Sequence, residues 1–324
     1  MAGMGDASSP SRPEASGTGA DPGPETVSAG TARPASGAAS GSPSGRPAPG
    51  ALPTHASAPP PAPGALVRRH ALATRLAHWV NALAVILLLM TGLQIFNAHP
   101  RLYWGAIGSW PDPAWLEMAG RDGRGWVSVA GLTLDTTGWL GWSGGQARGF
   151  PAWATLPGWR DLALGRNWHL ATAWLMVLNG LAWWLASLAN GHLARDILPR
   201  ARDLRLRALL HDIAEHARLR FPTGADSLRY QPLQKLSYFA VVAILLPLLV
   251  ATGLCMSPWA GAVAPGVVEL FGGRQSARSI HFLAAMGVAA FIAVHLLMVL
   301  LSGPWNQLRA MVTGRWRVPA GRAA

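Results

Sequence analysis

Four stretches of this 324-residue sequence contain no Asp, Glu, Lys or Arg, and each of them is long and apolar. These stretches cover residues 76–100, 167–194, 236–268 and 279–308. About 20 consecutive apolar residues are enough to cross the ~30 Å hydrocarbon core of a bilayer as a helix. The sequence therefore predicts an all-α integral membrane protein, a bundle of four transmembrane helices at about residues 74–96, 168–188, 236–256 and 279–302.

The first 65 residues have a different composition, dominated by Ala, Pro, Gly and Ser with scattered charges of both signs. Segments of this kind cannot bury enough apolar surface to offset the entropy cost of folding. We therefore expect a disordered N-terminal tail at residues 1–65, followed by one membrane domain at residues 66–318.

Basic residues indicate how the four helices cross the membrane. The loop at residues 190–235 holds nine Arg and Lys residues against five acidic residues, and Arg residues also flank the helical region at both ends. Cytoplasmic loops carry such an excess, so both termini and this loop are expected in the cytoplasm. The net charge of +12 is explained in the same way and does not indicate nucleic-acid binding.

The loop on the opposite side, residues 97–167, holds eight of the 16 Trp residues of the chain. A disordered loop would not be so aromatic, and Trp side chains favour the headgroup level of a membrane. We expect this outer loop to fold as a cap at the outer membrane surface.

Four histidines lie within the apolar stretches, where an ionisable side chain needs a partner and so suggests a functional site. They are His78, His169, His281 and His295. His281 and His295 are fourteen residues apart, which is about 21 Å and nearly four turns along one helix. They therefore share a face at two depths. The alternating helix directions place His78 at the depth of His295, and His169 at the depth of His281.

This arrangement predicts two haem groups, because neutral imidazoles are strong axial ligands of haem iron. Cys255 is the single cysteine of the chain, so neither a four-cysteine iron–sulfur cluster nor a C-x-x-C-H haem attachment site is available within it. The haems are therefore expected to be non-covalent b haems, ligated by the pairs His78/His295 and His169/His281. Iron with both axial positions filled has no site for a substrate, which favours electron transfer.

Two glycines also support the haem prediction, but their pattern is less specific than that of the four histidines. Gly92 lies on the helix face of His78 at the depth of the other haem, and Gly180 lies close to the face of His169. A glycine there either makes room for a flat macrocycle or lets two helices pack closely.

Arg278, three residues before His281, either pairs with haem propionates or is solvated among lipid headgroups. The six remaining histidines are expected to be solvated. Assistance in quinone protonation is a lesser alternative for His192 or His211.

The residues around the four histidines resemble a known family. Arg75-Leu76-Ala77-His78-Trp79, Trp168-His169 and Ser279-Ile280-His281, followed by His295, are similar to the bacterial cytochrome b561 and Ni/Fe-hydrogenase b-type cytochrome superfamily. The segments at 191–193, 230–235, 272–278 and 303–306 most resemble the branch described as thiosulfate reductase cytochrome b subunits.

This resemblance implies a four-helix bundle in the bacterial inner membrane that binds two b haems through the same four histidines. It also implies electron exchange with the quinone/quinol pool. The implied partner is a periplasmic oxidoreductase, often molybdopterin-containing, on the outer face. The chain would then be the electron-transfer cytochrome b subunit of an oxidoreductase complex.

Two other functions are compatible with parts of the sequence. A stand-alone quinone-linked oxidoreductase acting on a small oxidant such as superoxide would need no partner, but it would not require so large an aromatic loop. A transporter or membrane scaffold with histidine proton relays would show no haem absorbance. Acidic residues would be expected within its spans, and none is present in the four uncharged stretches.

Overall fold

The structure is a computed structural model that describes residues 61–189, 191, 198, 204–222, 224, 227 and 231–320. The described residues belong to one compact unit, Ala58–Ala324. Residues 1–60 of the predicted tail lie outside the described residues, as does part of the loop at residues 190–235.

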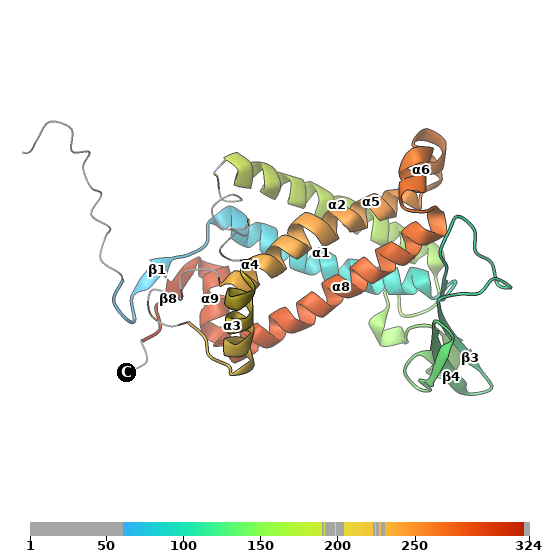
Figure 1. Ribbon diagram of the computed structural model, residues 1–324, viewed down its shortest axis with the longest axis horizontal. Helices are drawn as coiled ribbons and strands as arrows, with labels where there is room; N and C mark the ends of the chain where they lie inside the picture. The colour runs from blue at the N-terminus through green and yellow to red at the C-terminus, as the bar shows by residue number, and fades with distance from the viewer. Residues whose placement is uncertain are drawn as a thin grey trace, which may run out of the picture. The chain divides into compact units, whose positions relative to one another are not determined.

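Four helical segments are long and apolar enough to cross a membrane, and they correspond to the four predicted helices (Figure 1). They are α1 (Leu72–Phe96), α2 (Leu162–Ala189), the segment Pro232–Cys255 and α8 (Arg274–Leu301). Large apolar side chains such as Leu83, Leu178 and Leu300 are exposed on their surfaces, as contact with lipid requires. The predicted all-α membrane bundle is confirmed.

All four membrane segments begin earlier than predicted, and the difference is largest for α2, by six residues, and α8, by five. The prediction started each of these two helices after its last charged residue. Arg274 nevertheless lies at the start of α8 and Arg166 lies at the start of the second turn of α2, where long basic side chains can reach the headgroup level.

The third membrane segment is not one regular helix. It consists of α4 (Pro232–Phe239), a π-helical segment (Ala240–Leu245) and α5 (Leu246–Cys255). Pro247 has no backbone N–H, and its ring would clash with a carbonyl one turn earlier in a regular α-helix. The wider π turn immediately before Pro247 accommodates this interruption.

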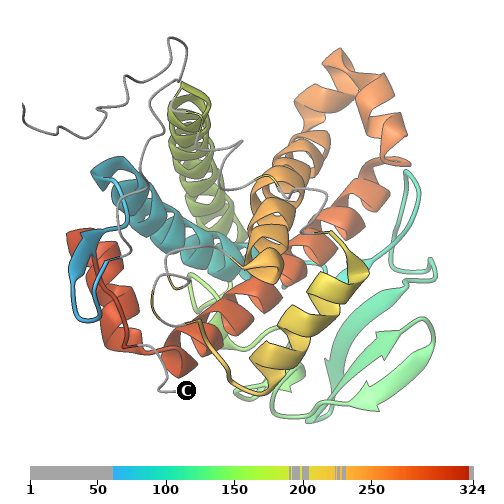
Figure 2. The same ribbon diagram turned by 60° about the vertical axis from the view of Figure 1, so that its left-hand side comes forward.

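The membrane helices pack mainly in two pairs, α1 with α2 and α5 with α8 (Figure 2). A polar contact joins the first pair, because Asn179 Nδ2 donates to the Ala77 carbonyl over 3.1 Å and to Asn81 Oδ1 over 2.8 Å. Such interhelical hydrogen bonds are a common means of association where both helices are apolar.

The segment between α1 and α2, residues 97–161, folds as a β-rich domain that we call the cap. Its antiparallel sheet has the order β2 (Arg101–Leu102), β3 (Leu116–Arg121), β4 (Arg124–Val129) and β5 (Leu132–Asp135). A separate hairpin pairs β6 (Gly141–Ser143) with β7 (Gln146–Arg148). The sequence predicted a folded cap but not its strands.

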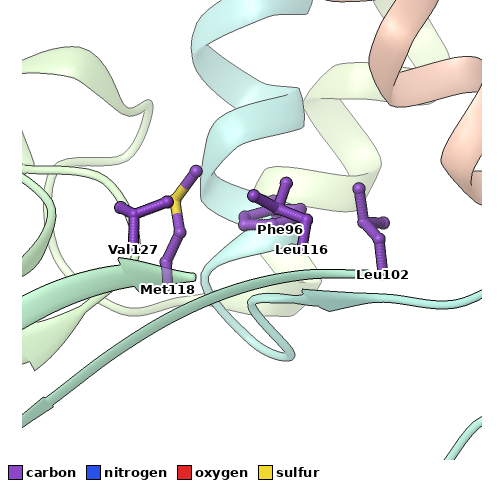
Figure 3. Packing of buried hydrophobic residues seen from close by; sticks show 5 residues of the cluster. All are labelled: Phe96, Leu102, Leu116, Met118 and Val127. Carbon is purple, nitrogen blue, oxygen red and sulfur yellow. The ribbon is translucent and has the colours of Figure 1, made fainter. Parts of the chain in front are cut away.

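A cluster of buried apolar residues fixes the cap on the bundle (Figure 3). Phe96 at the end of α1 packs with Leu102, Leu116, Met118 and Val127 of the cap, and Phe282 of α8 packs against the cluster. Burial of each large apolar side chain stabilises the fold by about 1.5–3 kcal/mol. The cap therefore rests on the ends of α1 and α8, which we call the cap end of the bundle.

The opposite end, which we call the terminal end, brings the first and last described residues together. Strand β1 (Leu66–Arg68) pairs antiparallel with β8 (Arg315–Arg317), which follows α9 (Pro304–Thr313). Helix α3 (Leu206–Ala217) packs against α4. At the cap end, two short helices, α6 (Pro258–Val263) and α7 (Pro265–Leu270), connect α5 with α8 (Figure 1).

Candidate haem sites

The structure brings the four predicted histidines together as two pairs. His169 of α2 and His281 of α8 have ring centroids 6.3 Å apart, with an angle of 59° between the ring planes. His78 of α1 and His295 of α8 have centroids 6.5 Å apart, with an angle of 54°. We call the first the cap-side pair and the second the terminal-side pair.

The spacing within each pair fits a haem iron. An imidazole nitrogen binds a metal at about 2.0–2.1 Å, so two rings that ligate one iron have centroids roughly 6 Å apart. No cluster of three or more His, Cys, Asp or Glu residues that could hold a metal ion occurs among the described residues. Two histidines suit a haem, because its macrocycle supplies the other ligands of the iron.

The cap-side pair is held by two threonines that the sequence reasoning missed. His169 Nδ1 lies 3.0 Å from Thr91 Oγ1 of α1, and His281 Nδ1 lies 3.1 Å from Thr252 Oγ1 of α5. Both threonine side chains are fully buried. The signal was present as a repeated triplet, Thr91-Gly92-Leu93 and Thr252-Gly253-Leu254.

The glycines of these triplets lie against the same rings. A Cβ on Gly92 would be 3.3 Å from His169 Cε1, and a Cβ on Gly253 would be 3.4 Å from His281 Cε1. Gly92 therefore lies at the depth of the cap-side pair, as its spacing from His78 predicted. A Cβ on Gly180 would meet nothing within 4 Å among the described residues.

The terminal-side pair has an aromatic environment instead. The Trp79 ring meets His78 edge-on at 5.3 Å between centroids, and Phe291 stacks on His295 at 5.7 Å with 17° between the planes. His78 Nδ1 is buried and has no hydrogen-bond partner among the described residues. His78 therefore differs from His169 and His281, whose Nδ1 atoms each lie within hydrogen-bond distance of a threonine hydroxyl.

Arg278 lies one turn before His281 and contacts the cap. Its Nη2 donates to the His99 carbonyl over 2.6 Å, and its Nη1 donates to the Arg101 carbonyl over 3.0 Å. A guanidinium has five N–H donors, so these two bonds leave donors for a further acceptor such as a propionate. The pairing of Arg278 with a haem propionate stays a prediction. The structure shows in addition that Arg278 binds two carbonyls of the cap.

Two of the histidines expected in solvent are instead packed against protein groups. The His216 side chain is 16% exposed, and its Nδ1 lies 3.1 Å from Asp212 Oδ1 of the preceding turn. His99 is half-buried beside Tyr103 and Trp110. Burial and the positive charges of Arg278 and Arg101 lower the pKa of His99 below its usual value. The expectation of solvation was wrong for both. His55 and His192 lie outside the described residues.

Comparison with known proteins agrees with this geometry. The family model described as prokaryotic cytochrome b561 matches residues 69–314, which is most of the chain. The chain belongs to the prokaryotic cytochrome b561 family. It is therefore a membrane cytochrome of the b type with an electron-transfer role. The resemblance to this superfamily seen in the sequence is confirmed, whereas the thiosulfate reductase branch stays a prediction.

A curated relative extends the comparison. This cytochrome is 28% identical over 240 residues to the putative protein-methionine-sulfoxide reductase subunit YedZ1 of Azospira oryzae. The matched region covers 74% of this chain and 93% of that protein. The similarity thus extends over nearly the whole length of a protein described as a subunit of a reductase.

Proposed function

We propose that this cytochrome binds two b haems, one at the cap-side pair and one at the terminal-side pair. It would pass electrons between the quinone/quinol pool and a periplasmic oxidoreductase. The observation that carries this proposal is the placement of His281 and His295 on one helix, each facing a histidine of another helix at 6.3 Å and 6.5 Å. A b haem with two histidine ligands supplies reversible one-electron transfer.

The protein holds the four histidine ligands in position and surrounds both proposed haem sites with apolar helices. Three helices carry the ligands, so the bundle fixes the separation of the two pairs at about 21 Å along α8. Hydrophobic surroundings and hydrogen bonding to the ligands are the means by which a protein tunes a haem. Arg278 is placed beside the cap-side pair, where its remaining donors would hold a propionate.

The test is a reduced-minus-oxidised spectrum with haem quantification on the purified full chain and on single His→Ala variants. We expect two b haems per chain. His169→Ala and His281→Ala should each lose the cap-side haem, and His78→Ala and His295→Ala should each lose the other. His211→Ala, on α3, is the matched control and should retain both.

Absence of haem from the folded wild-type chain would contradict the proposal and favour proton-relay or packing roles for the histidines. Retention of both haems in any of the four ligand variants would show that the ligand assignment is wrong at that position.

The same proposal includes an orientation in the bacterial inner membrane, with both termini cytoplasmic and the cap periplasmic. The excess of basic residues in the loop at 190–235 supports it. A reporter active only in the periplasm should be active when inserted in the turn Asp122-Gly123 of the cap, and inactive when fused after Ala324. The reverse pattern would refute this orientation.

The cap is the proposed docking surface for the oxidoreductase partner. Its exposed aromatic side chains include Trp110, Trp139 and Trp153, and aromatic residues are enriched at protein interfaces. The relative from Azospira oryzae points to a methionine-sulfoxide reductase as the partner. The resemblance to the thiosulfate reductase branch points instead to a molybdopterin-type enzyme.

The purified cytochrome, supplied with quinol, should support sulfoxide reduction only when the reductase partner is present. Oxidation of quinol by superoxide without any partner would instead favour the stand-alone alternative. The folded cap argues against that alternative, because a small oxidant needs no large protein surface.

A further inference from the structure

The cap-side pair is built from two equivalent halves. In each half, a Thr-Gly-Leu triplet on one helix faces a histidine on the neighbouring helix: Thr91 and Gly92 of α1 face His169 of α2. Thr252 and Gly253 of α5 face His281 of α8 in the same way. The two helix pairs thus present their histidines with the same two small residues behind the ring.

The hydroxyl hydrogen of each threonine is already in use. Thr91 Oγ1 donates to the Leu87 carbonyl over 2.7 Å, and Thr252 Oγ1 donates to the Leu248 carbonyl over 2.6 Å. A hydroxyl carries one hydrogen and two lone pairs, so towards the histidine it can only accept. The histidine Nδ1 must therefore carry the hydrogen, and the free lone pair of each ring is on Nε2.

The terminal-side pair has no such arrangement on His78, whose buried Nδ1 lacks a hydrogen-bond partner among the described residues. His78 therefore lacks the hydroxyl partner that His169 and His281 each have. A hydrogen bond accepted from the N–H of a ligating histidine fixes the tautomer and the ring orientation, and it raises the basicity of the ligand. A more basic ligand stabilises ferric over ferrous iron.

We propose that Thr91 and Thr252 are positioning residues that fix the cap-side ligands and lower the reduction potential of the haem bound there. This inference rests on the proposed haem-binding function. The threonines would act through His169 and His281 and would leave the terminal-side haem unaffected.

The test uses Thr91→Val and Thr252→Val, because valine keeps the branched shape and removes the hydroxyl. Thr91→Ser and Thr252→Ser retain the hydroxyl and are the matched controls. The readouts on the purified full-length cytochrome are the midpoint potential of each haem in a redox titration and the electron paramagnetic resonance g values of the ferric haems. The g values report ligand orientation and do not depend on activity.

Each valine variant should shift the ferric/ferrous equilibrium of one haem towards ferrous by about threefold, which is roughly 30 mV for a one-electron couple. Its g values should also change, and the double variant should show both shifts. The serine variants should match the wild type. The terminal-side haem should keep its potential in every variant and thereby show that the protein is folded.

Three results would overturn the inference. Valine variants with two haems and unchanged potentials and g values would show that the hydroxyls have no positioning role. Equal changes in the serine and valine variants would indicate side-chain volume instead of the hydroxyl. Absence of haem from the wild type would refute the proposed function itself, and it is distinguishable from the other two because the spectrum then lacks any haem signal.

Discussion

The indole Nε1 of Trp115 in the cap donates a hydrogen bond to Ser279 Oγ over 2.9 Å, and Ser279 lies two residues before His281 on α8. Ser279 Oγ in turn donates to the Tyr103 carbonyl over 2.6 Å. One turn earlier, Ser276 Oγ accepts from the Gly105 N–H over 2.7 Å. The cap is thus hydrogen-bonded to the first turns of the helix that carries two of the four proposed haem ligands.

Ser279→Ala should loosen this attachment. Ser279 is fully buried, and its loss leaves the Trp115 N–H and the Tyr103 carbonyl without their partner. Such unsatisfied buried groups cost about 1–3 kcal/mol each. We expect a lower unfolding temperature in detergent and faster hydrogen–deuterium exchange over residues 99–118. Ser128→Ala, at a half-buried serine of β4, should change neither measurement. Equal effects of the two substitutions would contradict the special role of Ser279.

His99 should make the stability of the cap depend on pH. Burial and the charges of Arg278 and Arg101 lower its folded pKa below the ordinary value of 6.5. Between these two pKa values the unfolded chain binds more protons than the folded chain, so stability rises with pH. The stability that neutral His99 contributes is therefore fully present above pH 6.5, and it is lost as the pH falls from 6.5 towards the lower pKa of the folded state.

The check is the unfolding temperature between pH 5 and pH 8, compared with His99→Gln. The variant keeps a polar side chain but cannot take up a proton in this range. It should show a weaker pH dependence than the wild type. An identical pH profile in the two proteins would exclude His99 as the titrating group.

The sequence predicted the membrane helices and the two histidine pairs because both depend on local, regular patterns. Uncharged apolar runs define a span by length alone, and fourteen residues place His281 and His295 on one face of any α-helix. Helix direction then follows from the order of spans. These inferences need no knowledge of which helices touch.

The strands of the cap were missed although their turns carried a signal. Asp122-Gly123, Ala130-Gly131 and Gly144-Gly145 each form a two-residue hairpin turn in which both residues have positive φ. Such a turn matches the twist of the flanking strands, and Asp-Gly is among its preferred sequences. The strands have only two to six residues, which is too short for alternation to stand out.

Contacts between residues far apart in the sequence could not be predicted, because local sequence patterns contain no information about them. The pairing of Leu66 with Arg317 joins residues from opposite ends of the described chain. The contact of Thr91 with His169 crosses between two helices separated by the whole cap. Each triplet is an ordinary membrane-helix sequence by itself, and only the fold shows that both triplets face a histidine.

Gly92 and Gly253 should respond to substitution differently from Gly261 of α6. A Cβ at Gly92 or Gly253 would lie 3.3 or 3.4 Å from a histidine Cε1, so the ring must shift by a few tenths of an ångström. Replacement of a helical glycine by alanine otherwise stabilises by roughly 0.5–1 kcal/mol. Gly261→Ala, on α6, which carries none of the four histidines, would place a Cβ with nothing within 4 Å among the described residues and should show that gain.

The expected result for Gly92→Ala and Gly253→Ala is a smaller gain or a loss of stability, with altered g values of the cap-side haem. The terminal-side haem should be unchanged. If Gly92→Ala behaves like Gly261→Ala in both stability and spectrum, the close contact with the ring has no consequence.

Asp212→Ala should release α3 from α4 at the terminal end. Asp212 is buried, and its Oδ2 accepts from the Leu233 N–H over 2.8 Å. Leu233 lies in the first turn of α4, where backbone N–H groups lack helical partners and a negative charge is favoured. Substitution by alanine leaves that N–H without an acceptor and should cost about 1–3 kcal/mol.

The measurement for this variant is hydrogen–deuterium exchange over residues 206–217, together with the unfolding temperature. Glu215→Ala is the matched control on the same helix, because Glu215 pairs with the exposed side chains of Arg218 and Arg220. Surface ion pairs contribute only about 0–1 kcal/mol, so the control should exchange at nearly the wild-type rate. Faster exchange in Asp212→Ala alone would show that one buried carboxylate holds α3 in place, whereas equal exchange in both variants would assign the docking of α3 to its apolar face.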